Sequence, residues 1–283
     1  MGKSIKSKII LVEGIPGSGK TSTAKYIKEL FDEYKIKSQL FLEGDVNHPA
    51  DYESAAYLSE IEYKNLLEKY SDIHEYIIKF TEVKGENYII YYGSMNKEID
   101  INDIGINKEL NMFDVYNLPL AMHKQLLIDK WKCFYEKVNQ TDEVFILENC
   151  FLQNPITITL GRDNEPKEMI INYIQTLEDC IKLLNPTIIY FYQDNVEKTI
   201  SRVIGERPEE WLRHLIYYFT EQGYGKANHL VGMKGVYEVL EIRKTIELEI
   251  LTKLEMNKMI INNSDFEWNE ILKKINKFLM VYQ

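Results

Sequence analysis

The most constraining feature of this chain is a short segment near its start, Gly14-Ile15-Pro16-Gly17-Ser18-Gly19-Lys20-Thr21. It has the pattern G-x-x-x-x-G-K-[ST] and directly follows the apolar run Ile9–Val12. The residues after it, Thr21–Tyr34, show a helical period, with one apolar face made of Ala24, Ile27, Leu30 and Phe31. A buried strand before this pattern and a helix after it are the context that a phosphate-binding loop requires. The segment therefore predicts a nucleoside triphosphate site, and an ordinary glycine-rich turn is the alternative.

The physical chemistry of such a loop assigns a role to each residue. Glycines let the backbone wrap closely around phosphate oxygens, and the helix start adds a favourable field for negative charge. Lys20 would reach the β- and γ-phosphates, and the Thr21 hydroxyl would bind Mg²⁺. The residues expected to bind the nucleotide are Gly14, Pro16, Gly17, Ser18, Gly19, Lys20, Thr21 and Ser22.

Composition narrows the classes of partner. The net charge of −10 and the pI of about 5.2 argue against nucleic acid or an anionic membrane as the main partner. The cysteines Cys133, Cys150 and Cys180 are widely spaced and form no C-x-x-C pair, as expected for a reducing cytoplasm without a zinc site. No long apolar core follows the first lysines, so we expect no signal peptide and a cytoplasmic location.

Five short apolar runs predict buried parallel strands: Lys8–Glu13, Ser38–Glu43, Glu143–Glu148, Thr187–Tyr192 and Lys258–Ile261. Helical patterns lie between and after these runs, which is the layout of an α/β sheet covered on both faces. The last helix is expected at about Asp265–Val281, with Ser264 or Asp265 as its N-cap. We therefore expect one α/β domain over residues 1–283.

The stretch between the second and third runs is too long for a single crossover, and it predicts a mainly helical insertion over residues 51–142. We expect helices at Tyr52–Tyr70, Asp72–Val83 and Leu118–Asn139, with a hairpin around Tyr88–Ile101. A later segment, Phe151–Pro166, contains two prolines and a glycine and is expected to be rich in loops.

Several of these segments together resemble the P-loop kinases that phosphorylate small molecules. The similar segments are Gly14–Thr21, Phe41–Asp45, Val144–Glu148, Pro186–Tyr192 and Val196–Arg207. This group includes nucleoside and nucleotide kinases, shikimate, gluconate and adenylylsulfate kinases, and chloramphenicol phosphotransferase. The phosphate loop is specific to nucleotide binding but not to kinases. The resemblance implies a five-stranded parallel sheet of order 2-3-1-4-5, ATP and Mg²⁺ as cofactors, and an arginine-bearing lid over the triphosphate.

Three carboxylates are expected at the carboxyl edge of the sheet, where reacting groups gather in such folds. Leu42-Glu43-Gly44-Asp45 resembles the strand end of gluconate and adenylylsulfate kinases, which makes Asp45 the first candidate for the general base and Glu43 the second. The alternative is that Asp45 only caps the following turn. Glu148 would bind a Mg²⁺-bound water or orient the acceptor, unless it is a hydrated strand end. Asn149-Cys150 stands where deoxynucleoside kinases have Arg-Ser, which leaves the role of Glu148 open.

Arginine usage supplies the expected lid. The chain has only five arginines, and Arg202, Arg207 and Arg213 fall close together after the fourth predicted strand. Arginine binds phosphate oxygens through two parallel hydrogen bonds, which lysine cannot copy. We expect a lid over residues 202–213, with Arg202 and Arg207 as its catalytic residues and Arg213 as helix surface. The alternative is a solvated basic face that pairs with Glu206, Glu209 and Glu210.

The acceptor is constrained by what the insertion lacks. Residues 44–142 contain no arginine, whereas nucleotide kinases hold the phosphate of their acceptor with arginines from this region. We therefore expect an uncharged or cationic, unphosphorylated small molecule with a hydroxyl. The tyrosines of the insertion would line its pocket or else serve as ordinary packing: Tyr52, Tyr57, Tyr63, Tyr91 and Tyr92. His48 would contact the acceptor or pack in the turn.

The sequence thus predicts an ATP- and Mg²⁺-dependent phosphotransferase that acts on a hydroxyl of a small molecule. The alternative is a nucleotide-dependent regulatory ATPase or switch whose insertion binds a protein. No Asn-Lys-x-Asp segment suited to guanine and no G-x-S-x-G is present, which disfavours a GTPase and a serine hydrolase. The scattered histidines disfavour catalytic zinc.

Overall fold

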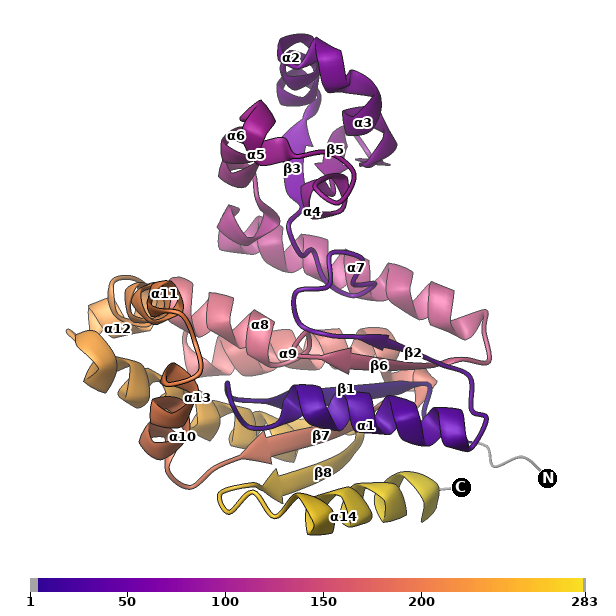
Figure 1. The fold of residues 1–283 in the computed structure, drawn as a ribbon, viewed down its shortest axis with the longest axis vertical. Coiled ribbons are helices and arrows are strands. Elements are labelled where there is room, and N and C mark those ends of the chain that lie inside the picture. Colours follow the sequence, from indigo (N-terminus) through magenta and orange to yellow (C-terminus); the bar gives the residue numbers. More distant parts are fainter. Residues whose placement is uncertain (1–4, 282–283) are drawn as a thin grey trace. The chain divides into compact units, whose positions relative to one another are not determined.

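The computed structural model describes residues 5–281 of the chain (Figure 1). The chain divides into two compact units. The core unit contains the chain up to Glu43 and from Trp131 onward, and the second unit is Gly44–Lys130. Each unit has its own sheet.

The core unit is built on five parallel strands. They are β1 (Ile9–Gly14), β2 (Ser38–Phe41), β6 (Val144–Glu148), β7 (Thr187–Tyr192) and β8 (Asn257–Asn262). The strands lie in the order β2-β6-β1-β7-β8, which is 2-3-1-4-5 when the five are counted along the chain. The five predicted strands and their order are confirmed, with small differences at the strand ends.

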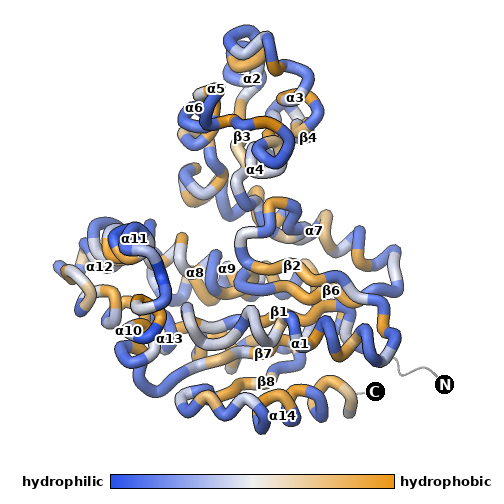
Figure 2. Tube along the Cα trace, viewed as in Figure 1, coloured by the Kyte–Doolittle hydropathy of each residue, from blue (hydrophilic) through white to orange (hydrophobic). Residues whose placement is uncertain are grey.

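One face of this sheet is covered by α1 (Lys20–Glu33) and α14 (Trp268–Val281). Ile10 and Val12 of β1 pack with Ala24 of α1 and Ile271 of α14 in one buried cluster. The three inner strands β1, β6 and β7 are mainly hydrophobic along their length because both faces are buried (Figure 2). The last helix begins at Trp268 and not at Asp265, so neither Ser264 nor Asp265 is its N-cap.

The other face packs against α9 (Lys167–Ile181), α13 (Gly232–Lys253) and the end of α7 (Leu120–Asn139). In α7, the Phe134 ring meets Phe145 of β6 edge-on with centroids 5.4 Å apart, and Trp131 meets Phe151 at 5.6 Å. The expected helix Leu118–Asn139 is therefore present, but its last turns belong to the core. For this reason the second unit is Gly44–Lys130, whereas the expected insertion was given as residues 51–142.

After β7 the chain forms α10 (Val196–Ile204), α11 (Glu209–Thr220) and α12 (Gly223–Ala227) before α13. Ile200 of α10, Phe219 of α11 and Val239 of α13 share a buried cluster with Ile15 of the phosphate loop. This packing holds α10 against α11, α13 and the phosphate loop.

The second unit is mainly helical, as expected, and it also contains an antiparallel sheet of order β3-β5-β4. Its strands are β3 (Ala56–Ser59), β4 (Thr81–Lys84) and β5 (Asn87–Ile90). Its helices are α2 (Glu60–Lys69), α3 (His74–Lys79), α4 (Tyr92–Met95), α5 (Ile101–Ile104) and α6 (Asn107–Met112), with 3₁₀ turns η1 (Ser71–Ile73) and η2 (Val115–Asn117) and the start of α7.

Two predicted helices and the predicted hairpin of this unit were wrong in extent. The expected helix Tyr52–Tyr70 begins only after β3, where Ser59 caps α2 through a capping box with Glu62. The expected helix Asp72–Val83 is split into η1, α3 and β4. The hairpin lies at Thr81–Ile90 and not at Tyr88–Ile101, because Gly85 at φ 64° supplies the turn and β5 is pinned between two strands.

The segment Phe151–Pro166 was also wrongly expected to be loop. It forms α8 (Gln153–Ile156) and a π-helical turn, η3 (Thr157–Arg162). Pro155 lies in the first turn of α8, where proline is tolerated. Burial of Ile156 and Leu160 stabilises the helical path. Between residues 5 and 281, no helix combines the length and the apolar character needed to cross a membrane.

Candidate active site

The phosphate loop joins β1 to α1 and is held by close packing around its glycines. Gly14, Gly17 and Gly19 have φ of 145°, 76° and 96°, which side chains rarely adopt. A Cβ on Gly17 would lie 2.1 Å from Val203 Cγ2, and one on Gly19 would lie 1.9 Å from Trp268 Cη2. Glycine is therefore required twice over, by backbone conformation and by contact with α10 and α14.

Two distant side chains bind the carbonyls of the loop. Arg202 Nη2 donates to Gly17 O at 2.8 Å, and the buried Asn263 Nδ2 donates to Ser18 O at 2.7 Å. The Ser18 hydroxyl is fully buried and has no hydrogen-bond partner within the described residues. A donor of this kind suits a phosphate oxygen, because a buried polar group without a partner is costly. The loop therefore has the features of an anion site.

Lys20 lies beneath the loop with only 5% of its side chain exposed, and its ammonium donates to Ile15 O at 2.9 Å. Burial lowers the pKa of this ammonium, while the negative charges of Glu43 and Glu148 act in the opposite direction. The predicted phosphate-binding lysine thus shares its surroundings with two of the three predicted carboxylates.

The Thr21 hydroxyl donates to Glu148 Oε1 at 2.6 Å. Glu148 is buried at the end of β6, and its other oxygen accepts from Glu43 N at 3.3 Å. Thr21 and Glu148 are the residues predicted to hold Mg²⁺, and the fold brings them into contact. Oxygen atoms of this kind suit Mg²⁺, which binds through few protein ligands and keeps several waters. No cluster of three or more His, Cys, Asp or Glu side chains suited to a metal is found among residues 5–281.

Glu43 is held by two amides that the sequence did not single out. Asn149 Nδ2 donates to Glu43 Oε2 at 2.5 Å, and Gln153 Nε2 donates to Glu43 Oε1 at 2.8 Å. Asn149 has φ 66°, a conformation that asparagine tolerates better than most residues. The departure from the Arg-Ser pair of deoxynucleoside kinases therefore has a structural consequence, because Asn149 fixes the orientation of Glu43.

Glu13, the last polar residue of β1, is a further buried carboxylate that sequence reasoning missed. Its oxygens accept from Phe151 N at 2.7 Å and Gln153 N at 3.0 Å. Burial raises the pKa of Glu13 to about 7, the backbone N–H donors oppose this rise, and Glu247 adds to it. The sequence did contain a signal for this residue, because an acidic residue within an apolar strand is unusual. Glu13 ties β1 to the segment that supplies Gln153.

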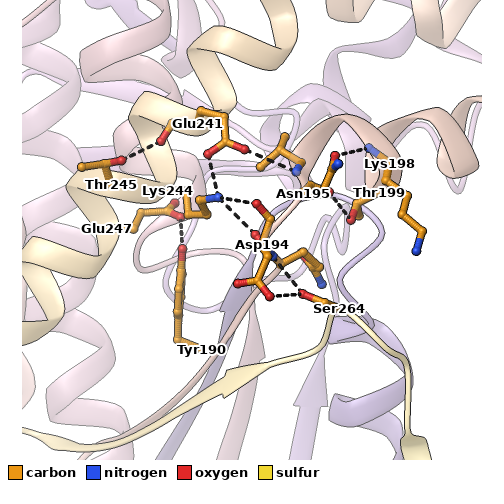
Figure 3. A network of polar contacts seen from close by, with 12 residues as sticks. Tyr190, Asp194, Asn195, Lys198, Thr199, Glu241, Lys244, Thr245, Glu247 and Ser264 are labelled. Atoms are coloured by element: carbon orange, nitrogen blue, oxygen red, sulfur yellow. Dashed lines mark hydrogen bonds and ion pairs between the residues drawn. The ribbon is translucent and has the colours of Figure 1, made fainter.

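A charged network is also buried between β7 and α13. Tyr190 donates to Glu247 Oε2 at 2.6 Å (Figure 3), and Arg243 Nε donates to Glu247 Oε1 at 2.7 Å. Arg243 and Glu247 are almost fully buried, so each neutralises the other.

The phosphate loop opens into a cavity of about 510 Å³, called here the phosphate-loop cavity. Besides the loop it is lined by Glu43, Glu148, Arg202, Val203, Glu206, Arg207, Trp211, Phe266 and Trp268. The guanidinium of Arg202 lies 3.7 Å from the centre of the Phe266 ring, and that of Arg207 lies 5.9 Å from the Trp211 ring. The core thus brings both predicted lid arginines to the loop. The aromatic residues of the cavity had no recognisable sequence signal.

Arg213 does not line this cavity. Its exposed side chain lies on α11, 3.7 Å from Glu209. This arrangement agrees with the expectation that Arg213 is helix surface. Its contact with Glu209 is also the kind of solvated ion pair that was the alternative role for all three arginines.

Asp45 belongs to the second unit, where it makes the turn contacts that were the alternative to a catalytic role. Its Oδ1 accepts from Asn47 N at 3.0 Å, and its backbone carbonyl accepts from His48 N at 2.9 Å. His48 is buried, and burial lowers the pKa of its imidazole. Its Nδ1 accepts from Ala50 N at 3.2 Å, so packing in the turn accounts for it. The role of Asp45 as a base stays a prediction.

The tyrosines of the second unit serve mainly as packing. Tyr52, Tyr63 and Tyr92 are buried, and the Tyr63 ring stacks on Tyr88 with centroids 4.1 Å apart. Tyr92 donates to the buried Asp114 at 2.6 Å. The pocket expected from these residues stays a prediction.

Comparisons with known proteins give a limited result. No protein-family model matches the chain, and no curated protein matches it. Among solved structures, a thymidylate kinase from Candida albicans is similar, with a TM-score of 0.41 and 14% identity over 96% of this chain and 94% of that chain. In the core unit itself, a phosphate loop follows the central strand of a parallel sheet of order 2-3-1-4-5. This strand order and this position of the loop are those that the resemblance implied.

Proposed function

We propose that this protein transfers a phosphoryl group from ATP to a hydroxyl of a small molecule, with Mg²⁺ as cofactor. The observation that carries the proposal is the 2.6 Å contact between Thr21 and Glu148 at the mouth of the phosphate loop. A hydroxyl and a carboxylate in contact beside a buried lysine provide the Mg²⁺ and phosphate ligands of phosphoryl transfer.

Each residue of the phosphate-loop cavity has a role in this proposal. Lys20 binds the β- and γ-phosphates, while Thr21 and Glu148 hold the Mg²⁺ ion, which neutralises charge on the phosphates. Arg202 and Arg207 close over the triphosphate and stabilise the charge of the transition state. A carboxylate, Asp45 or Glu43, accepts the proton of the acceptor hydroxyl as its oxygen attacks the γ-phosphorus and the bond to ADP breaks.

The proposed acceptor is an unphosphorylated compound, neutral or cationic. No arginine is available between residues 44 and 142 to grip an acceptor phosphate. Lys130, a cation of the second unit, lies 4.6 Å from the Tyr52 ring and 4.9 Å from the Tyr91 ring, and donates to Tyr91 OH at 3.0 Å. These contacts engage its ammonium within the unit and support an acceptor without a phosphate.

The test is ADP release in the presence of Mg²⁺, with panels of nucleosides, sugars, aminated antibiotics and nucleoside monophosphates. We expect turnover with a neutral or cationic hydroxyl compound, and its loss in Lys20→Ala together with weaker ATP binding by calorimetry. Unchanged ATP affinity and turnover in Lys20→Ala would overturn the assignment of the loop. Turnover of dTMP, UMP or AMP alone would show that lysines grip an acceptor phosphate.

The second candidate is a regulatory ATPase or switch that binds a protein partner. Exposed apolar side chains of the second unit favour it, including Ile61, Ile78, Val83 and Met112. ATP hydrolysis that no small hydroxyl compound stimulates, but that a protein partner does, would support this reading.

A further inference from the structure

A second cavity of about 740 Å³ lies in the core unit between α10, α12 and α13, and we call it the α10–α13 cavity. None of its lining residues lines the phosphate-loop cavity. Its apolar wall consists of Tyr224, Leu230, Tyr237 and Ile242. The volume and the aromatic wall are those of a site for a small organic ligand.

The charge around this cavity is negative. Asp194, Glu197, Glu238 and Glu241 line it, and the only cationic side chain among its lining residues is Lys234. Two of these carboxylates have structural partners: Asp194 accepts from Asn262 and Ser264, and Glu241 binds Lys244 (Figure 3 shows the contacts with Ser264 and Lys244).

The other two, Glu197 and Glu238, form no hydrogen bond or ion pair within residues 5–281. These two exposed carboxylates line the same cavity as the rings of Tyr224 and Tyr237, and the set favours a cation, because both the negative charges and the faces of aromatic rings attract one. The apolar wall requires that this cation carry a hydrocarbon body.

We propose that the α10–α13 cavity is a regulatory site for an organic cation, namely an amine or quaternary ammonium compound with an apolar or aromatic body. Its occupancy changes the affinity of the phosphate loop for nucleotide. This site is separate from the phosphate-loop cavity and needs no phosphoryl transfer.

The route of coupling is short and passes along α10. The helix begins at the cavity, where Val196 N donates to Glu241 Oε1 at 3.3 Å. It ends at the phosphate loop, where Val203 packs on Gly17 and Arg202 donates to Gly17 O. A ligand that displaces the start of α10 would therefore move Arg202 relative to the loop.

A second connection reaches the loop from the same edge of the cavity. The Ser264 hydroxyl contacts the backbone N–H of Asp194 at 2.9 Å (Figure 3), and the neighbouring Asn263 donates to Ser18 O at 2.7 Å. Both routes end on carbonyls of the phosphate loop. The two sites are thus joined by α10 and by the segment of Asn263 and Ser264, a contiguous set of contacts of the kind through which energetic coupling passes.

Calorimetry with the whole chain tests the cavity. The probe is benzyltrimethylammonium, compared with the neutral benzyl alcohol and the anionic benzoate. We expect the cation to bind at least about tenfold more tightly than benzoate. Replacement of both free carboxylates, Glu197→Gln with Glu238→Gln, should weaken the cation by about threefold or more and leave benzyl alcohol unchanged. Leu230→Trp, which fills the cavity, should weaken both.

Glu136→Gln on α7 is the matched control, because it removes an exposed carboxylate that does not line the cavity. It should leave binding of the cation unchanged. Equal affinity for the cation and benzoate, or equal loss in Glu136→Gln, would overturn the site.

Titration of ATP without Mg²⁺ tests the coupling. Saturating benzyltrimethylammonium should shift the Kd of ATP by at least about twofold in the wild type and leave it unchanged in Leu230→Trp. An unchanged Kd in the wild type would overturn the regulatory role. Binding of the cation itself is measured without nucleotide, so failure of the proposed phosphotransferase activity would not decide this test.

Discussion

The hydroxyl of Thr21, in the first turn of α1, donates a 2.6 Å hydrogen bond to the carboxylate of Glu148, the last residue of β6. The two residues are 127 positions apart in the chain. The parallel pairing of β1 with β6 brings them together, because it places the end of β6 beside the start of the phosphate loop. This contact connects the nucleotide side of the cavity to the carboxylate edge of the sheet.

The first prediction concerns this contact. Thr21→Val keeps the shape of the side chain but removes the hydroxyl, which leaves buried Glu148 without that donor and the Mg²⁺ ion without a ligand. We expect turnover to fall by about 10²-fold or more and the half-saturating Mg²⁺ concentration to rise. Thr21→Ser, which keeps the hydroxyl, should retain most of the activity. ADP release over a Mg²⁺ titration measures both, and an unchanged Mg²⁺ requirement in Thr21→Val would contradict the metal assignment.

The second prediction separates the two candidate bases. Asp45→Asn keeps the shape and the turn contact but removes the proton acceptor, so turnover should fall by roughly 10²–10⁴-fold with little change in ATP affinity. Glu43→Gln is the matched comparison, because the Glu43 side chain lies inside the phosphate-loop cavity. If Glu43→Gln shows that loss and Asp45→Asn does not, Glu43 is the base. Thermal unfolding of both variants checks that the fold is retained.

The core could be read from the sequence because each of its signals is local. An uninterrupted apolar run such as Ile9–Val12 predicts a buried parallel strand, and the glycines of the loop predict its backbone conformation. The second unit could not be read in this way. Its strands are four residues long, and the residues Ala56–Ser59 are held extended by pairing with β5, which periodicity does not reveal.

The residues of the candidate site also differ in whether a local sequence signal reveals them. Lys20, Thr21 and the strand-end carboxylates were predictable because motif and topology fix their positions. Asn263, Phe266 and Trp268 were not, because they reach the loop through tertiary contacts from a segment about 245 residues away. Asn149 had a signal, its departure from the family pattern, but its contact with Glu43 follows only from the fold.

The third prediction concerns Arg202, which both stacks on Phe266 and donates to Gly17 O. Arg202→Lys keeps the charge but loses the planar fork, so we expect the KM for ATP to rise by about tenfold and kcat to fall. Arg213→Lys is the control, because Arg213 is exposed and contacts only Glu209 at 3.7 Å among the described ion pairs. Steady-state kinetics measure the KM for ATP and the kcat of both variants. Equal effects of the two substitutions would show that Arg202 contributes charge alone and not geometry.

The last prediction uses the buried carboxylate of Glu13. Burial raises its pKa from 4.5 to about 7 in the folded protein, so the folded state holds a proton that the unfolded chain has already lost. Because the folded state then binds more protons, the free energy of unfolding should fall as pH rises between about 4.5 and 7 and level off above that. Glu13→Gln cannot ionise and should lose this dependence. It should also weaken the contacts to Phe151 N and Gln153 N, but by an amount that does not change with pH.

The measurement is urea unfolding of both proteins at several pH values. The stability of Glu13→Gln relative to the wild type should rise by on the order of 2–3 kcal/mol from pH 4.5 to pH 8. A constant difference across that range would mean that Glu13 is ionised throughout, with its charge compensated by the two N–H donors.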